Sequence, residues 1–204
     1  MKQNKIPFLV LSAFLMLFLA VTLSSCVPTA PELTEPNFTS TPGEPPVLVN
    51  GDFETGDFTG WKVTTSNRFP YVQSDYLSHS GAYSAFMGDG ADYLWSGATK
   101  TNTASIEQTV EIPNGSGALK PLLSFYYLVV NLSDTSETGW DWMKVYINDN
   151  EIFRVDNHTN GWKEFTYDLS SYMGSTITLK VSSWTNDVND RFLYFVDDIT
   201  ITWY

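Results

Sequence analysis

The residues of this chain that could do chemistry are acidic and aromatic rather than nucleophilic. Its 204 residues include 23 acidic residues, 15% aromatic residues, two histidines and one cysteine. His79 and His158 stand alone, and no G-x-S-x-G, H-E-x-x-H or phosphate-cradling glycine loop occurs. We therefore expect no catalytic residue and no enzyme activity, although a carboxylate pair for glycosidic cleavage is recognised only by its separation in space.

Several aromatic side chains are candidates for one binding surface. Successive residues of a β-strand point to opposite faces of the sheet. With the apolar residues of segment 142–147 in the core, the side chains that point outward are Trp142, Lys144 and Tyr146. The same alternation turns outward Tyr126, Lys180, Trp184 and, if Leu193 and Phe195 lie inside, Tyr194. We expect these residues to share one outer face.

Flat aromatic rings on such a face would stack on the apolar C–H faces of sugars, while nearby polar groups orient the hydroxyls. Turn-rich stretches supply further aromatic residues that could wall the site: Tyr71, Tyr76, Tyr93, Trp95 and Trp140. Asp141, between two tryptophans, falls on the inward side, where it could bind calcium or a backbone amide, or contact a ligand. Alternatively, loops cover the outward aromatics, and a register error of one residue would exchange the two faces.

The elements that would position these residues are many short strands. Apolar runs and alternations are separated by Gly, Asn, Asp, Ser and Pro, which is typical of strands joined by turns. The expected strands are Val47–Val49, Trp61–Thr65, Tyr83–Met87, Ala104–Ile112, Pro121–Val130, Met143–Ile147, Glu151–Val155, Lys163–Asp168, Thr176–Trp184 and Leu193–Trp203. Segment 147–151 predicts a hairpin turn, because Asn and Asp tolerate left-handed backbone. About ten strands in one domain predict an all-β sandwich or barrel.

The N-terminal residues have the order of a secretory signal. Lys2 and Lys5 precede an apolar stretch, Ile6–Val21, and small polar residues then lead to Cys26. The apolar stretch is shorter than the roughly 20 residues that span a membrane comfortably. Leu23-Ser24-Ser25-Cys26 resembles the bacterial lipobox, which implies cleavage after residue 25 and lipidation of Cys26. A retained anchor helix, or an ordinary signal peptide with a chance cysteine, is the alternative.

The mature chain is expected to be a tethered, strongly acidic domain. Residues 26–46 are rich in Pro, Thr and Glu and predict a disordered linker, and residues 47–204 suffice for a single domain. Loss of residues 1–25 removes Lys2 and Lys5 and no acidic residue, which leaves 9 basic and 23 acidic residues and a net charge of −14. Such a surface repels nucleic acid and anionic lipid.

Several motifs carry a resemblance to known families. The segment Asn50-Gly51-Asp52-Phe53-Glu54, followed by Gly60-Trp61, resembles the opening of jelly-roll carbohydrate-binding modules and of the related MAM-type adhesion domains. Further matches follow in the families' order at 78–84, 106–108, 123–127, 162–169 and 195–199. The resemblance implies a jelly-roll β-sandwich of two antiparallel sheets. It constrains function less, because such sandwiches host sugar binders, adhesion modules and accessory domains.

The resemblance also implies a structural calcium ion where the two ends of the domain meet. The positions that match its ligands are Glu54 and either Asp198 or Asp197, with Asp52 nearby. A third ligand would come from Asp75 or from the Ser78 carbonyl. Calcium takes six to eight oxygen ligands and could fasten a terminal strand in a chain that has no disulfide. Alternatively, these carboxylates only cap turns.

Three functions remain open for the chain. The first is a glycan-binding module that uses the aromatic face, anchored to the extracytoplasmic side of a bacterial membrane through Cys26. The second is a MAM-like module that binds a surface protein. The third is a lone-domain polysaccharide hydrolase, for which nothing in the sequence marks a catalytic pair.

Overall fold

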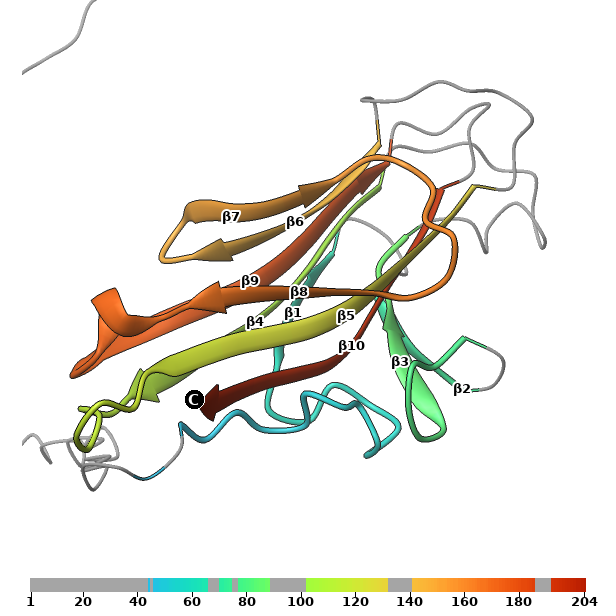
Figure 1. The fold of residues 1–204 in the computed structure, drawn as a ribbon. Coiled ribbons are helices and arrows are strands. Elements are labelled where there is room, and N and C mark those ends of the chain that lie inside the picture. The colour runs from blue at the N-terminus through green and yellow to red at the C-terminus, as the bar shows by residue number, and fades with distance from the viewer. Residues whose placement is uncertain are drawn as a thin grey trace, which may run out of the picture. The chain divides into compact units, whose positions relative to one another are not determined.

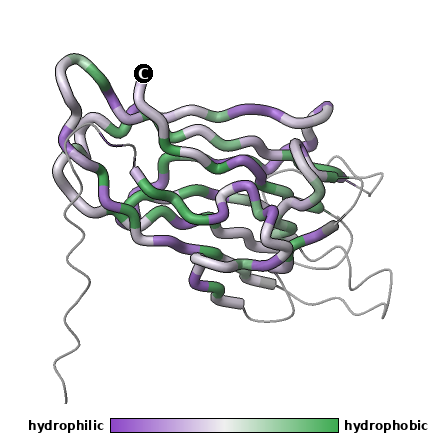
Figure 2. Tube along the Cα trace, turned by 90° about the horizontal axis from the view of Figure 1, so that it is seen from below, coloured by the Kyte–Doolittle hydropathy of each residue, from purple (hydrophilic) through white to green (hydrophobic). Residues whose placement is uncertain are grey.

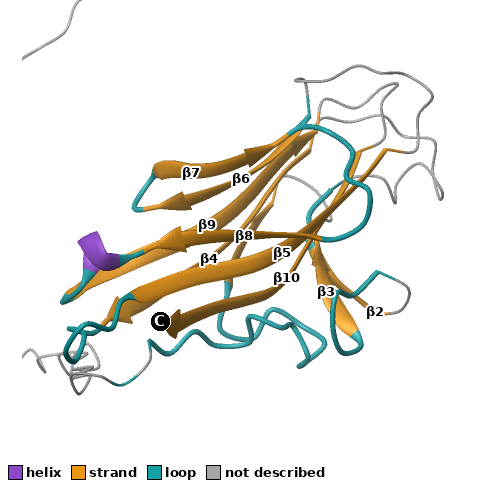
Figure 3. Ribbon diagram, in the orientation of Figure 1, coloured by secondary structure: helices purple, strands orange, loops and turns teal. Residues whose placement is uncertain are grey.

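The computed structural model describes residues 44, 46–65, 70–74, 77–88, 102–131, 141–185 and 192–204. Ten strands form two layers (Figure 1). The strands are β1 Lys62–Thr65, β2 Tyr71–Ser74, β3 Tyr83–Phe86, β4 Asn102–Ile112, β5 Pro121–Asn131, β6 Trp142–Ile147, β7 Asn150–Val155, β8 Lys163–Asp168, β9 Ser175–Thr185 and β10 Phe192–Trp203. One 3-10 turn, η1 (Ser170–Tyr172), is the only helical element of the described residues (Figure 3).

The strands form two antiparallel five-stranded sheets. Sheet A has the order β1-β4-β9-β6-β7, and sheet B has the order β2-β3-β10-β5-β8. This is an all-β jelly-roll sandwich, which confirms the fold class expected from the sequence. A search of the described residues for a helix long and apolar enough to cross a membrane finds none.

The core lies between the two sheets and follows the period-two pattern of the strands. In β5, Leu123, Phe125 and Val129 are buried, and in β6 the residues 143, 145 and 147 are buried. Hydrophobic and hydrophilic residues accordingly alternate along the chain (Figure 2). Burial of one face of each sheet sets the register, because a slip of one residue would move every core side chain to the outer face.

The hairpin turn between β6 and β7 is confirmed. Asn148 and Asp149 have φ angles of 49° and 64°, so both central residues of the turn are left-handed. Two such residues match the twist of the flanking strands, and Asn and Asp adopt this backbone at low cost. The turn places Ile147 opposite Asn150 and therefore Tyr146 opposite Glu151.

Two expectations about strands were wrong. Residues 47–49 are not a strand; instead, the Gln108 side chain accepts a hydrogen bond from Val49 N (2.7 Å) and donates one to Val49 O (3.0 Å). An amide side chain thus replaces the partner strand. Conversely, Tyr71, expected in a loop, begins the short edge strand β2, whose four residues are too few to give a clear alternation.

Candidate functional site

The outer face of sheet A carries a pair of tryptophans. Trp142 of β6 and Trp184 of β9 are directly opposite each other in the sheet register. Their rings are stacked, with centroids 6.5 Å apart and an angle of 21° between the planes. Both side chains are partly exposed, as the alternation predicted. Two nearly parallel indoles on neighbouring strands form an apolar patch that borders solvent.

A charged row crosses the same face four residue pairs further along the strands. The register aligns Lys62, Glu107, Lys180, Tyr146 and Glu151 on the five neighbouring strands. Lys62 Nζ lies 2.6 Å from Glu107 Oε1. Lys180 Nζ lies 5.9 Å from the Tyr146 ring centroid. This row presents donors and acceptors beside one aromatic ring, a combination that suits hydroxyl-rich ligands.

Short hydroxyl side chains fill the strands between these two rows. Thr64, Ser105 and Ser182 are aligned on β1, β4 and β9, and Lys144 continues the line on β6. Ser105 and Ser182 are only 7% and 6% exposed, and Ser182 Oγ donates a hydrogen bond to Ala104 O. We call the tryptophan pair, the charged row and this hydroxyl band together the sheet A face.

Lys144 links the tryptophan pair to the charged row. Its Nζ lies 4.7 Å from the Trp142 ring centroid and 2.6 Å from Glu151 Oε2. Glu151 was not among the candidates from the sequence, because plain alternation places it with the inward residues of β7. The two-residue turn was the signal that could have found it, since that turn sets Glu151 opposite Tyr146.

Tyr126 does not share the sheet A face. It lies on β5 in sheet B, and the His79 ring stacks on it with centroids 3.5 Å apart and an interplanar angle of 11°. The Trp162 ring meets His79 edge-on at 5.7 Å. The expectation of one shared outer face was therefore wrong for Tyr126, because alternation does not reveal to which sheet a strand belongs.

Tyr194 is buried rather than outward. Its exposure is 0%, and it belongs to the main core with Phe192 and Val196. Phe195 instead points outward, where its ring packs 4.9 Å from Phe86 in a second apolar cluster that includes Leu77. Apolar residues lie on both faces of β10, so its sequence pattern could not decide which set faces the core. The burial of Tyr194 excludes contact with a ligand at the surface.

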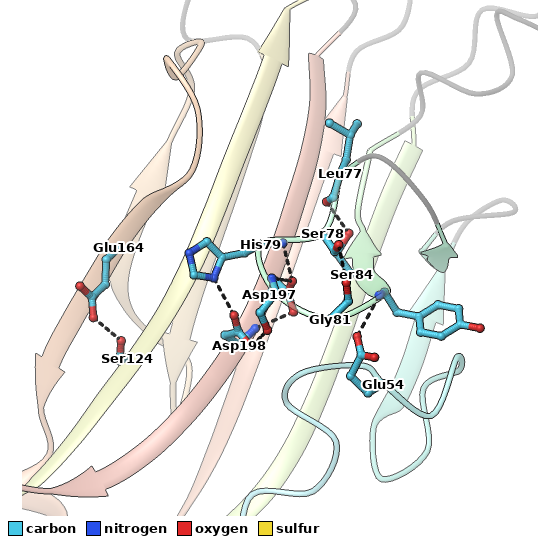
Figure 4. A network of polar contacts seen from close by, with 12 residues as sticks. Glu54, Leu77, Ser78, His79, Gly81, Ser84, Ser124, Glu164, Asp197 and Asp198 are labelled. Atoms are coloured by element: carbon cyan, nitrogen blue, oxygen red, sulfur yellow. Dashed lines mark hydrogen bonds and ion pairs between the residues drawn. The ribbon is translucent and has the colours of Figure 1, made fainter.

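The carboxylates proposed as calcium ligands bind the backbone of segment 78–83 (Figure 4). Glu54 Oε1 accepts hydrogen bonds from Ala82 N (2.8 Å) and Tyr83 N (2.9 Å). A Cβ atom on residue 81 would lie only 2.3 Å from Glu54 Oε1, so a side chain there would clash with the carboxylate. The φ of residue 81 is +58°, which also favours glycine. Glu54 thus ties the first turns of the domain to this segment.

The two aspartates of β10 bind the same segment from the other side. Asp197 Oδ2 accepts hydrogen bonds from His79 N (2.8 Å) and Ser80 N (3.3 Å). Asp198 Oδ2 lies 2.6 Å from His79 Nδ1, and Asp198 Oδ1 accepts a hydrogen bond from the Ser80 hydroxyl at 2.8 Å. Adjacent residues of a regular strand would face opposite ways, but β10 is irregular after Asp197 and Asp198 has a φ of 49°.

Burial raises the pKa of Asp197 to about 6, against the hydrogen bonds from His79 N and Asp198 N, which lower it. The described residues contain no group of three or more His, Cys, Asp or Glu side chains that could hold a metal ion. The Asp52 side chain accepts only a long hydrogen bond, 3.4 Å, from Glu54 N. In this arrangement Glu54, Asp197 and Asp198 contact backbone and side-chain groups of the protein. The calcium site stays a prediction.

Several predicted site residues lie outside the described residues: Cys26, Asp75, Tyr76, Tyr93, Trp95 and Trp140. The signal peptide and the linker up to residue 43 also lie outside them. Asp141 is described and is 2% exposed, which confirms its inward direction.

Comparison with known proteins supports the fold. A scan against protein-family models and a search of curated proteins both give no match. Among solved structures, the carbohydrate-binding module TmCBM61 in complex with beta-1,4-galactotriose matches with a TM-score of 0.54 and 21% identity, covering 77% of this chain and 97% of that chain. The CBM22-1 xylan-binding domain from Paenibacillus barcinonensis gives a TM-score of 0.43 and 14% identity, over 80% and 97% of the two chains. An enzymatically active domain of a tailspike protein of bacteriophage CBA120 gives 0.49 and 10%, over 77% of this chain and 21% of that chain.

Proposed function

We propose that this chain is a non-catalytic carbohydrate-binding module that takes its glycan on the sheet A face. The observation that carries the proposal is the partly exposed, stacked pair of Trp142 and Trp184 on the outer side of a jelly-roll sheet. Neighbouring indoles that are partly exposed favour a ligand that is apolar on one side and hydroxylated on its edges. A polysaccharide ring has this combination.

The spacing of the aromatic groups favours an extended glycan over a single sugar. Trp142 and Tyr146 are four residues apart on β6, and a strand rises about 3.3 Å per residue, so their Cα atoms are about 13 Å apart. A glycan that reaches both rings crosses the hydroxyl band. Lys144 in the hydroxyl band can donate hydrogen bonds to its hydroxyl groups, and in the charged row Lys180 can donate and Glu107 can accept them.

Affinity electrophoresis of the purified full-length protein in mild detergent tests this function. Gels containing β-1,4-galactan, xylan or β-glucan should retard the wild type, and Trp142→Ala should abolish the retardation. Trp162→Ala, a tryptophan of sheet B, is the matched control and should leave mobility as in the wild type. Unchanged wild-type mobility across a broad panel of polysaccharides would exclude the function, and recovery of a glycan-independent protein partner from cell surfaces would favour the adhesion alternative.

We also propose that Cys26 carries a lipid that holds the domain on the extracytoplasmic side of a bacterial membrane. The lipobox-like residues 23–26 and the preceding apolar stretch support this placement. Two or more acyl chains anchor a protein stably, whereas one chain anchors it marginally. The wild type should partition into the detergent phase of a Triton X-114 extract and Cys26→Ser should not; equal partitioning of both proteins would remove the anchor.

The calcium proposal has a test of its own. If an ion fastens Glu54 and the β10 aspartates, chelation should lower the melting temperature and added calcium should restore it. If chelator does not change the melting temperature, no calcium ion is bound, and hydrogen bonds alone connect these carboxylates to segment 78–83. Glycan retardation measured with and without chelator separates this question from binding.

A further inference from the structure

An ion pair on the sheet A face contacts the tryptophan pair directly. Glu151 holds Lys144 at 2.6 Å, Lys144 Nζ lies 4.7 Å from the Trp142 ring, and Trp142 stacks on Trp184. This chain of contacts runs across three neighbouring strands, β7, β6 and β9. We infer that Glu151 and Lys144 are positioning residues, which fix the orientation of the indole pair that binds the glycan. The inference rests on the proposed function.

The surroundings of Lys144 make its position depend on Glu151. The Lys144 side chain is only 17% exposed, so most of it packs against its neighbours. Its neighbour across the β6–β7 pair is another cation, Arg154, which is itself paired with Asp156 at 3.3 Å. Without a carboxylate, the two cations would repel, and Lys144 would turn toward solvent. Glu151 therefore keeps the ammonium close to Trp142, where the indole face attracts it.

The two-residue turn puts Glu151 on the outer face, opposite Tyr146, and a bulge in β7 follows it. Val145 pairs with Phe153, but the next residue, Tyr146, pairs with Glu151, so Ile152 is an extra residue in the strand. In a regular strand, Phe153 would share the outer side of Glu151. Bulges commonly re-aim side chains next to binding sites. Here the extra residue returns Phe153 to the inward side, so the carboxylate stays on the outer face while the ring packs against the core.

Sheet B offers a control ion pair that lies outside the sheet A face. Lys120 Nζ lies 3.9 Å from Asp168 Oδ2 of β8. The Lys120 side chain is 53% exposed, and Lys120 directly precedes β5 of sheet B. A general loss of surface charge would act equally at both pairs, whereas a positioning role is limited to Lys144 and Glu151.

The test combines circular dichroism of the stacked indoles with glycan affinity in the full-length protein. Glu151→Gln and Lys144→Met should each weaken the exciton signal of the Trp142–Trp184 pair and lower affinity for β-1,4-galactan about two- to fivefold. Lys144→Arg, which keeps the cation, should restore both quantities, and Lys120→Met should change neither.

The outcomes separate the positioning role from the function itself. An unchanged exciton signal in both Glu151→Gln and Lys144→Met overturns the positioning role, even if galactan binds. An equal loss of affinity in Lys120→Met overturns it as well. A wild type that binds no polysaccharide overturns the proposed function, while the exciton signal still decides whether the ion pair fixes the indoles.

Discussion

The outer faces of the two sheets both carry aromatic residues, but these residues are partly exposed on sheet A and covered on sheet B. On sheet A, Trp142 and Trp184 are stacked and partly exposed. On sheet B, Tyr126 lies under the His79 ring, and Phe195 is 1% exposed within an apolar cluster that includes Leu77. An outward aromatic residue is therefore a ligand candidate on one sheet and part of the packing on the other.

The difference arises from one covering segment and the carboxylates that hold it. Residues 77–83 follow β2 and cross the outer side of sheet B, where Asp197 and Asp198 bind their backbone and side chains (Figure 4). Leu77 and the His79 ring of this segment pack on sheet B, and the hydrogen bonds to the aspartates hold the segment in place.

The largest difference between the two outer faces is expected in the free energy of unfolding of variants on each face. Phe195→Ala should lower the free energy of unfolding by about 3–5 kcal/mol, because it removes a buried ring from a packed cluster. Trp142→Ala should cost no more than about 1 kcal/mol, since its ring is only partly buried. Urea denaturation of the two variants measures both values. Equal costs would show that sheet A is covered as well.

Binding should give the opposite order. Trp184→Ala should weaken polysaccharide retardation at least about tenfold, as expected for an aromatic residue at the centre of a binding face. Tyr126→Ala should bind as the wild type does, because His79 already occupies its ring face. Loss of binding in Tyr126→Ala alone would move the site to sheet B.

The pH dependence of stability tests how the cover is held. Because burial raises the pKa of Asp197 to about 6, the folded protein binds this proton more tightly than the unfolded chain does. This contribution is fully present below about pH 4 and is lost as pH rises through about 6. With chelator present, the melting temperature of the wild type should rise by roughly a few degrees, relative to Asp197→Asn, when pH falls from about 7 to about 4.5. Parallel profiles for the two proteins would contradict the buried position of Asp197.

The smallest effect is expected at the stack between His79 and Tyr126. His79→Ala should destabilise the protein by about 1 kcal/mol, because it removes one stacked pair and the contact with Asp198. It should also expose the Tyr126 ring to solvent quenchers of tyrosine fluorescence, without creating glycan binding on sheet B. Unchanged tyrosine accessibility would mean that other residues cover this ring.

Much of the fold could be predicted because its signals are local. Alternation in β6 correctly separated Trp142 and Lys144 from the core, and the Asn148-Asp149 turn correctly predicted a hairpin. The error at Tyr194 came from a strand with apolar residues on both faces, for which alternation gives two equal answers. The outer side of β10 is buried as well because residues 77–83, more than 100 positions earlier in the sequence, cover it.

What the amino-acid sequence determined by itself was the order of strands and turns, and which side chains of most strands face together. These follow from backbone geometry and from neighbouring residues. Only the tertiary structure decided that Tyr126 and Trp142 lie on different sheets, that Glu151 reaches Lys144, and that Asp197 and Asp198 bind one segment. Glu151 reaches Lys144 because β6 and β7 pair across the turn, and irregular pairing of β10 turns Asp198 toward the segment that Asp197 also binds.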